Sequence, residues 1–430
     1  MRRFLSLALG LILLAGCAPA QSMGPAPSEG SQPPAQSQPE PPAQSQPEPP
    51  APEPEPKPIV SRLMVAGDVM SHMPLTNDCY VKETDSYDYG HVLRDAAQQL
   101  ALADYAVANL ETTLAGGPEY SGYPRFNSPD GLAYSIRDAG FDLLCTTNNH
   151  CLDKGVSGLN RTLDVLDEAG VPHVGTYRTQ EERDENQGIY VADVGGISVA
   201  FLAYTYGLNG HRLPKDGPYA ANVFNTDYYT SVSNPDYELL RADMAAARAL
   251  DADLIAVIIH WGWEYHTKQN RNQEELARFL VEQGAGLVLG GHPHVLQPYD
   301  MVTVTGADGE ERQGFVIYSL GNFISNQNFS DDRKKDLATK TTVILDLELT
   351  KSPDGNTSLT DVRYTPYYML HRNGKPVGER RFLVNVSQSI ADYESGNSVL
   401  IDKKSYNQLL QARELCHEIL GGEGDRASEP

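Results

Sequence analysis

Apolar and polar positions follow two different rhythms along this chain. Up to about residue 290, apolar residues at helical spacing alternate with short apolar runs typical of buried strands. Helices are expected at 91–102, 130–139, 236–250 and 272–284. Leu159, Leu163 and Leu166 mark one face of another helix, which Gly170 ends. Strands are expected at 59–66, 104–110, 141–147, 253–259 and 286–290, with a hairpin around 195–196. From residue 294 the pattern is mainly of strands, with a last helix at 404–419. This order predicts an α/β fold.

The start of the chain has the pattern of a secretory signal. Met1-Arg2-Arg3 is positive, and the apolar stretch that follows leads into Leu14-Ala15-Gly16-Cys17. This segment resembles the lipobox of bacterial lipoproteins, in which Cys17 is lipidated and becomes the mature N-terminus. Ordinary signal cleavage nearby, with Cys17 incidental, is the alternative. The resemblance implies an exported protein anchored to the outer face of the bacterial cell membrane.

A proline-rich segment separates this signal from the first strand. Residues 18–58 hold 15 of the 29 Pro, and PPAQSQPE occurs at 33–40 and again at 41–48. Such composition buries too little apolar surface to fold, so we expect an extended spacer.

Charge and cysteine content argue against two classes of protein, nucleic-acid-binding and disulfide-rich. With 34 Lys+Arg against 57 Asp+Glu, the net charge is −23, which argues against a nucleic-acid partner. After Cys17 only Cys79, Cys145, Cys151 and Cys416 remain, too few for a disulfide framework. Cys145 and Cys151 could pair, but free thiols are the favoured interpretation.

Metal-type side chains follow five separate predicted strands. They are Asp68, then Asn109 with Glu111, then Asn148, Asn149 and His150, then His260, and finally His292 with His294. Ligands in α/β sheets bind beyond the carboxyl ends of strands, so we expect these groups to meet at one edge. A metal site explains so many His, carboxylate and Asn side chains at one edge better than structural hydrogen bonding does.

The motifs that carry these residues resemble a known family. GDVM, NLETT, NNHCLDKG, HWGWEY, GHPHVLQP and SLGNF are similar to the CapA branch of the calcineurin-like metallophosphoesterases, the bacterial capsule (poly-γ-glutamate) synthesis proteins. The resemblance covers about residues 60–330. It implies a four-layer α-β-β-α sandwich of two mixed sheets and a centre with two metal ions.

The N-terminal patterns and the family resemblance together predict a division of the chain. A lipoprotein signal at 1–17 and a spacer at 18–58 precede a CapA-like domain at 59–350. Residues 351–430 extend the same domain with strands and a helix, and the tail from Gly421 is expected to be disordered.

Motif by motif, the resemblance assigns roles to this chain's residues. Asp68 and His294 would hold one ion, and Asn149, His260 and His292 the other. Glu111 takes the place of the bridging Asp. His150 matches the position that protonates the leaving group. Asp153 would orient His150 or cap the following helix.

One expected ligand is missing. Met70 stands where the wider family has His, and His72, two residues on, is either a substitute or a loop residue. The first ion is therefore expected to be weakly held. The donors suit Mn, Fe or Zn, and the pattern does not choose among them.

Substrate contacts are less defined by sequence. Arg125 is either an anion contact or a surface residue, and Asn322 is expected to hydrogen-bond behind the site. Residues 204–211 are either a rim loop of the site or an ordinary loop. Trp261 and Trp263 are either a stacking surface or core.

Two functions follow. The first is an anchored two-metal hydrolase that cleaves a phosphoester or related cell-envelope bond during production of capsule or another extracellular polymer. The alternative is a non-enzymatic assembly or export factor for a membrane polymer synthase. Metal content separates the two.

Overall fold

The computed structural model describes residues 56–306 and 309–426. The predicted signal, Cys17 and most of the spacer lie outside these residues. In the part of the chain that is described, no helix combines the length and apolarity needed to cross a bilayer.

The larger of the two main sheets has eight strands. Its order is β16-β15-β14-β1-β4-β5-β6, with β13 also paired to β1. Their bounds are β1 (Ile59–Val69), β4 (Tyr105–Leu110), β5 (Leu143–Cys145), β6 (His173–Val174), β13 (Asn322–Ile324), β14 (Thr341–Lys351), β15 (Thr357–His371) and β16 (Arg381–Asn385). Strand β1 pairs in parallel with β4 and β13 and antiparallel with β14, so the sheet is mixed.

The second sheet has six strands in the order β11-β12-β10-β9-β8-β7. Their bounds are β7 (Tyr190–Val194), β8 (Ile197–Thr205), β9 (Leu254–His260), β10 (Leu287–Gly291), β11 (Leu296–Thr305) and β12 (Glu311–Leu320). Strands β8, β9, β10 and β12 run parallel, and β7 and β11 close the edges antiparallel.

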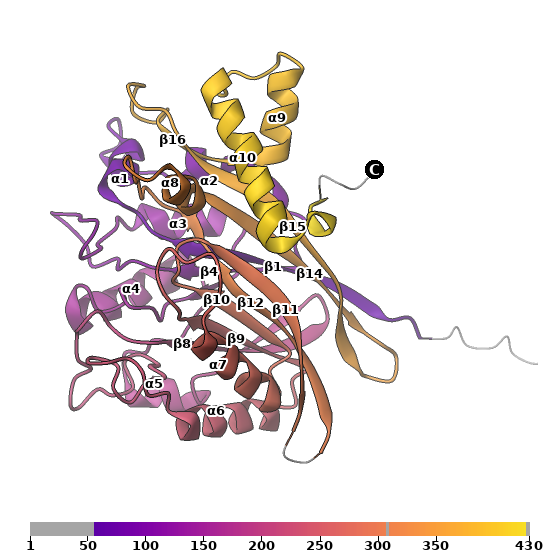
Figure 1. The fold of residues 1–430 in the computed structure, drawn as a ribbon. Helices are drawn as coiled ribbons and strands as arrows, with labels where there is room; N and C mark the ends of the chain where they lie inside the picture. Colours follow the sequence, from indigo (N-terminus) through magenta and orange to yellow (C-terminus); the bar gives the residue numbers. More distant parts are fainter. Residues whose placement is uncertain (1–55, 307–308, 427–430) are drawn as a thin grey trace, which may run out of the picture. The chain divides into compact units, whose positions relative to one another are not determined.

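The two sheets pack face to face, and helices cover the outer face of each, which gives four layers. Between the sheets, Leu63 and Val107 of the larger sheet share one buried cluster with Phe201 and Leu287 of the smaller. Helices α2 (Gly90–Leu100), α3 (Gly131–Asp138) and α4 (Gly155–Ala169) contribute to a cluster on the outer face of the larger sheet. Helices α6 (Tyr237–Ala249) and α7 (Arg271–Glu282) cover the outer face of the smaller sheet (Figure 1). The predicted α-β-β-α sandwich is confirmed.

Shorter elements complete the described chain. They are α1 (Met73–Asp78), β2 (Tyr80–Val81), β3 (Ser86–Tyr87), α5 (Gln180–Glu185), α8 (Arg333–Lys340), α9 (Val386–Glu394), α10 (Lys403–Leu420) and the 3₁₀ turn η1 (Gly422–Gly424). Helices α9 and α10 pack on β15 and β16 through Leu409 and Ile390.

Local sequence signals explain several boundaries. Helix α7 begins with a capping box, in which Asn270 and Gln273 satisfy each other's backbone N–H groups. Helix α4 ends at Gly170, whose φ of 73° is a left-handed cap. Gly195 and Gly196 both have positive φ in the tight turn between β7 and β8, as a two-residue hairpin requires.

The structure corrects the expectation of a disordered tail for residues 421–426, while residues 427–430 lie outside the described part of the chain. Asp425 is only 1% exposed and lies 2.8 Å from Nε2 of His417 on α10. The turn η1 also brings Gly421 to the hydroxyl of Tyr364, which donates to its carbonyl at 2.6 Å. The polar, glycine-rich composition of this segment favoured disorder, and composition does not reveal tertiary contacts. The four described cysteines are free and buried, which confirms the favoured interpretation for Cys145 and Cys151.

Candidate metal centre

Asp68 lies where the two sheets meet. It is buried near the end of β1, and its Oδ1 accepts a hydrogen bond from Nδ2 of Asn109 at 2.8 Å. Its Oδ2 accepts the backbone N–H of His292, which follows β10 of the other sheet, at 3.1 Å. The donors were predicted at one sheet edge, but they come from the edges of two sheets. Strands β1, β4 and β5 supply residues from one sheet, and β9 and β10 supply residues from the other.

Glu111 occupies the middle of the cluster. Both carboxylate oxygens are buried, and neither has a hydrogen-bond partner among the described residues. Nε2 of His260 lies 3.4 Å from Oε1, and Nδ1 of His294 lies 4.0 Å from Oε2. Two sets of donor atoms each converge within 4.8 Å, and both include Glu111: one with Asp68 and His260, the other with His292 and His294. A residue shared by two sets suits a bridging ligand.

The histidines are held in unusual backbone. His292 and His294 have φ of 95° and 60°, in a region that costs free energy for residues other than glycine and that is found at functional sites. Before them, Gly291 has no room for a side chain, since a Cβ there would lie 2.7 Å from Oδ1 of Asp68. The GGHPH segment thus lets the backbone of one sheet approach the carboxylate of the other.

Burial shifts the protonation of the whole cluster. Burial first, and the charge of Glu111 second, raise the pKa of Asp68 to about 7. Burial also raises the pKa of Glu111 to about 8 and lowers that of His260 to about 4. The pKa values of His292 and His294 fall well below the usual range for the same reason.

These residues fit a divalent cation. Neutral imidazoles are the form that binds metal, and buried carboxylates are ionised at lowest cost beside a positive ion. The oxygens of Glu111 and Nδ1 of His292 are buried without a hydrogen-bond partner in residues 56–306 and 309–426, which is the state expected of ligand atoms. The distribution of individual residues between two ions stays a prediction.

His150 and Asp153 form a pair beside the cluster. Nδ1 of His150 lies 2.7 Å from Oδ2 of Asp153, and the ring of Phe126 packs edge-on against His150. Burial opposes the charged imidazole, but the hydrogen bond to Asp153 and the charge of Glu111 outweigh it and raise the pKa of His150. Nearby, Oδ1 of Asn149 lies 2.9 Å from Nε2 of His260.

The other sequence-predicted residues lie at different distances from the cluster. Asn322 of β13 contacts it directly, with its Oδ1 3.0 Å from Nδ1 of His294. Arg125 is exposed, one residue before Phe126, and its role stays a prediction. His72 belongs to neither donor set: its Nδ1 accepts the backbone N–H of Asn326 at 3.3 Å. Met70 is buried.

Sequence reasoning missed three side chains that touch the site. The ring of Tyr206 lies 4.5 Å from that of His292 and nearly parallel to that of His260. Nδ2 of Asn209 lies 3.4 Å from both ring nitrogens of His150, and its Oδ1 accepts from Asn149 at 3.1 Å. Tyr265 lies 5.9 Å from His294 between ring centres. The first two belong to the segment 204–211, so only the expectation of a rim loop pointed to them.

The two tryptophans have different environments. Trp261 is 2% exposed, and its indole N–H donates to the carbonyl of Tyr318. Trp263 is 60% exposed and lines a cavity of about 300 Å³ that His292 also lines. Trp261 is therefore core, while Trp263 is available for contact.

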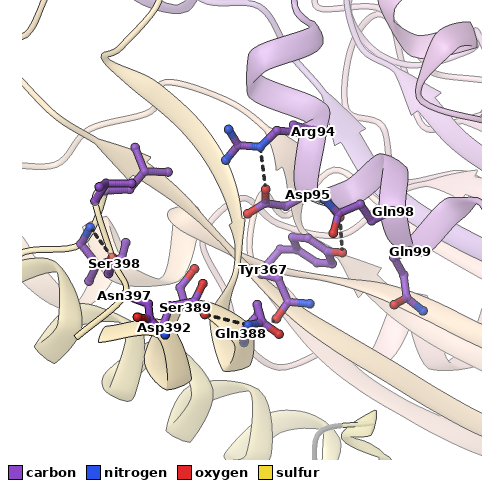
Figure 2. Close-up of a pocket in the computed structure, with 14 residues that line it drawn as sticks. Arg94, Asp95, Gln98, Gln99, Tyr367, Gln388, Ser389, Asp392, Asn397 and Ser398 are labelled. Carbon is purple, nitrogen blue, oxygen red and sulfur yellow. Dashed lines mark hydrogen bonds and ion pairs between the residues drawn. The ribbon is translucent and has the colours of Figure 1, made fainter. Parts of the chain in front are cut away.

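A second cavity, of about 470 Å³, shares no lining residue with the cluster. Figure 2 shows Arg94 and Asp95 of α2 on one side and Gln388 and Asp392 of α9 on the other. Arg94 is paired with Asp95 at 3.1 Å. This polar cavity is separate from the metal-type donors.

Comparison with known proteins gives relatives and solved structures. The chain is 30% identical over 284 residues to the capsule biosynthesis protein CapA of Bacillus anthracis, covering 64% of this chain and 62% of that protein. It is 28% identical over 228 residues to the PGA biosynthesis protein CapA of Bacillus subtilis, covering 53% and 52%. The chain thus spans less than two thirds of the length of these two curated relatives.

Among solved structures, the NAD nucleotidase of Haemophilus influenzae matches at 12% identity and a TM-score of 0.44, covering 85% of this chain and 64% of that one. The calcineurin-like phosphoesterase YfkN of Bacillus subtilis matches at 13% and 0.38, covering 84% and 98%. The model of the bacterial capsule synthesis protein family PGA_cap matches residues 62–327, a segment that contains every residue of the two donor sets. The chain belongs to this family.

Proposed function

We propose that this protein is a metal-dependent hydrolase that cleaves a phosphoester or related cell-envelope bond during synthesis of an extracellular polymer. One observation carries the proposal: two sets of buried donors share Glu111, whose oxygens have no partner among the described residues. The capsule and PGA biosynthesis named for the relatives suggest the process.

Two divalent ions would be bound by six side chains, those of Asp68, Glu111, Asn149, His260, His292 and His294. When bound, such ions polarise a phosphoryl oxygen and activate water near neutral pH. The protein orients and buries these ligands: Asn109 fixes Asp68, and Asn322 contacts Nδ1 of His294.

His150 is the proposed general acid. Its Nδ1 is held by Asp153, so the proton on Nε2 is the one available for a leaving oxygen. The raised pKa keeps more of the imidazole protonated near neutral pH than an exposed histidine would be. A lipid on Cys17 and the spacer at 18–58 would hold this site at the outer face of the membrane.

Hydrolysis of bis(p-nitrophenyl) phosphate by the full chain, supplied with Mn²⁺ or Zn²⁺, tests the proposal. We expect metal-dependent turnover that falls by about 10²–10⁴-fold in His150→Ala with bound metal unchanged. A metal-loaded protein that cleaves neither this nor other phosphodiesters contradicts it.

One feature favours a second candidate, a non-enzymatic assembly factor for a membrane polymer synthase. The buried Met70 replaces a metal-binding His of the wider family, and His72 does not join the donor sets. A protein without bound metal that still supports polymer production in cells, even as the His260→Ala variant, would select this function.

A further inference from the structure

A pocket of about 300 Å³ opens beside the metal centre. We call it the Trp263 pocket, and its walls include Tyr206, Asn225, Trp263, Glu264, Asn272 and His292. Because His292 belongs to both the pocket and a donor set, a substrate held at the metal centre has this pocket as its neighbour.

The pocket offers one free aromatic face. Tyr206 is already packed against the rings of His260 and His292. Among the described aromatic rings, Trp263 is paired with His266 alone, at 5.6 Å between ring centres, and 60% of Trp263 is exposed. An indole left uncovered beside a functional cluster has no packing role to explain it, whereas a ligand with an apolar face would cover it.

Four of the polar side chains that line this pocket are amides, those of Asn225, Asn270, Asn272 and Gln273. Asn225 donates its Nδ2 to the carbonyl of Tyr206, which leaves its Oδ1 as an acceptor. Asn270 uses its Oδ1 to cap α7, which leaves its Nδ2 as a donor, and the exposed Asn272 lies on the first turn of that helix. Amides that both donate and accept suit hydroxyl groups.

Charge excludes an anion from the pocket itself. Among the described residues that line it, none is Lys or Arg, and Glu264 is the single charged side chain. The negative part of a substrate is therefore directed toward the metal centre, and an uncharged part toward Trp263.

We propose that the Trp263 pocket binds the uncharged sugar ring of a substrate held at the metal centre. The C–H face of a pyranose covers one aromatic ring, its hydroxyls match the amides, and the volume suits one ring. This inference rests on the proposed function in one respect, since it places the ester of that sugar at the metal ions.

Binding preference tests the inference. Calorimetry on the metal-loaded full chain, in a His150→Ala background that slows turnover, compares glucose 1-phosphate, glycerol 1-phosphate and adenosine 5′-monophosphate. We expect glucose 1-phosphate to bind about tenfold tighter than glycerol 1-phosphate. Trp263→Ala should abolish this ratio, and Tyr134→Ala, a partly exposed aromatic on α3, should keep it. No preference for the sugar, a preference for the nucleotide, or a ratio that survives Trp263→Ala overturns the inference.

A second measurement separates the inference from the proposed function. The chain has two Trp, the buried Trp261 and the exposed Trp263, and both line the pocket, so tryptophan emission reports it. Methyl glucopyranoside, which has no phosphate, should change this emission saturably, and Trp263→Phe should remove the change. A response to the glycoside without binding of any phosphoester supports the pocket and contradicts the proposed hydrolase. Equal binding of phosphoesters with and without a sugar ring, together with no response to the glycoside, contradicts the pocket and leaves the proposed hydrolase supported.

Discussion

Nδ1 of His150 lies 2.7 Å from Oδ2 of Asp153, and the same carboxylate oxygen accepts the backbone N–H of Phe126 at 2.6 Å. The backbone contact fixes Asp153, and Asp153 in turn fixes the ring of His150. Since Nδ1 is engaged, Nε2 is the nitrogen left to exchange a proton with a substrate. Asp153 is therefore a positioning residue.

Replacing Asp153 should change both rate and pH dependence. Asp153→Asn should lower kcat by about 10–100-fold, because the imidazole loses its orientation. Asp153 also raises the pKa of His150, so its loss should move the alkaline limb of the pH–rate profile to lower pH. The exposed Asp138→Asn is the matched control. A reduced kcat with an unmoved limb would reduce Asp153 to a structural role.

The metal-free protein should lose stability as pH rises from about 6.5 to 8. The pKa values of Asp68 and Glu111 are about 7 and about 8 in the folded state, against about 4 when unfolded. The folded state thus holds more protons in this range, and the free energy of unfolding falls with pH. Below about 6.5 the depressed pKa of His260 acts in the opposite direction, because stability is then lost as pH falls.

Urea unfolding in the presence of a chelator measures this slope. Glu111→Gln removes one of the two carboxyl groups, so its unfolding free energy should fall less between pH 6.5 and 8. Exposed Glu275→Gln should behave as wild type. Equal slopes in all three proteins would show that Glu111 does not titrate as described.

Asn109 should control metal affinity from behind the ligands. It donates to Asp68 at 2.8 Å and accepts from Asn148 at 3.1 Å. Loss of a partner that orients a ligand costs about 10–100-fold in metal affinity, which is the effect expected for Asn109→Leu in a chelator competition. The exposed Asn407→Leu serves as control. An Asn109→Leu affinity within about twofold of wild type would be inconsistent with that role.

Asp78 should hold a distant loop by hydrogen bonds to its backbone. Its buried carboxylate accepts the backbone N–H groups of Gly378, Arg380 and Arg381. Asp78→Ala leaves these donors unmatched and should lower the free energy of unfolding by about 3 kcal/mol, measured by denaturant titration. Exposed Glu83→Ala should change it by less than about 0.5 kcal/mol. A similarly small effect in Asp78→Ala would refute the account of this loop.

The sequence predicted which residues form the cluster better than it predicted which sheets supply them. Polar residues at strand ends marked Asp68 and His260, because periodicity locates where strands stop. Periodicity does not say which strands pair, so it could not predict that β1 and β9 belong to different sheets. Tyr206 and Asn209 lie in an aperiodic loop, and their contact with the cluster depends on tertiary folding. The ordered structure of residues 421–426 was missed for the same reason, since Asp425 is buried by tertiary contacts with α10 and with Tyr364 of β15.

Metal content tests the central claim most directly. Elemental analysis of the full chain, purified and supplied with Mn²⁺ or Zn²⁺, should find about two ions per chain. His260→Ala should lower the number, and His72→Ala, which lies outside both donor sets, should not. Absence of stoichiometric metal in the wild type, or equal loss in the two variants, would contradict a metal centre built on Glu111.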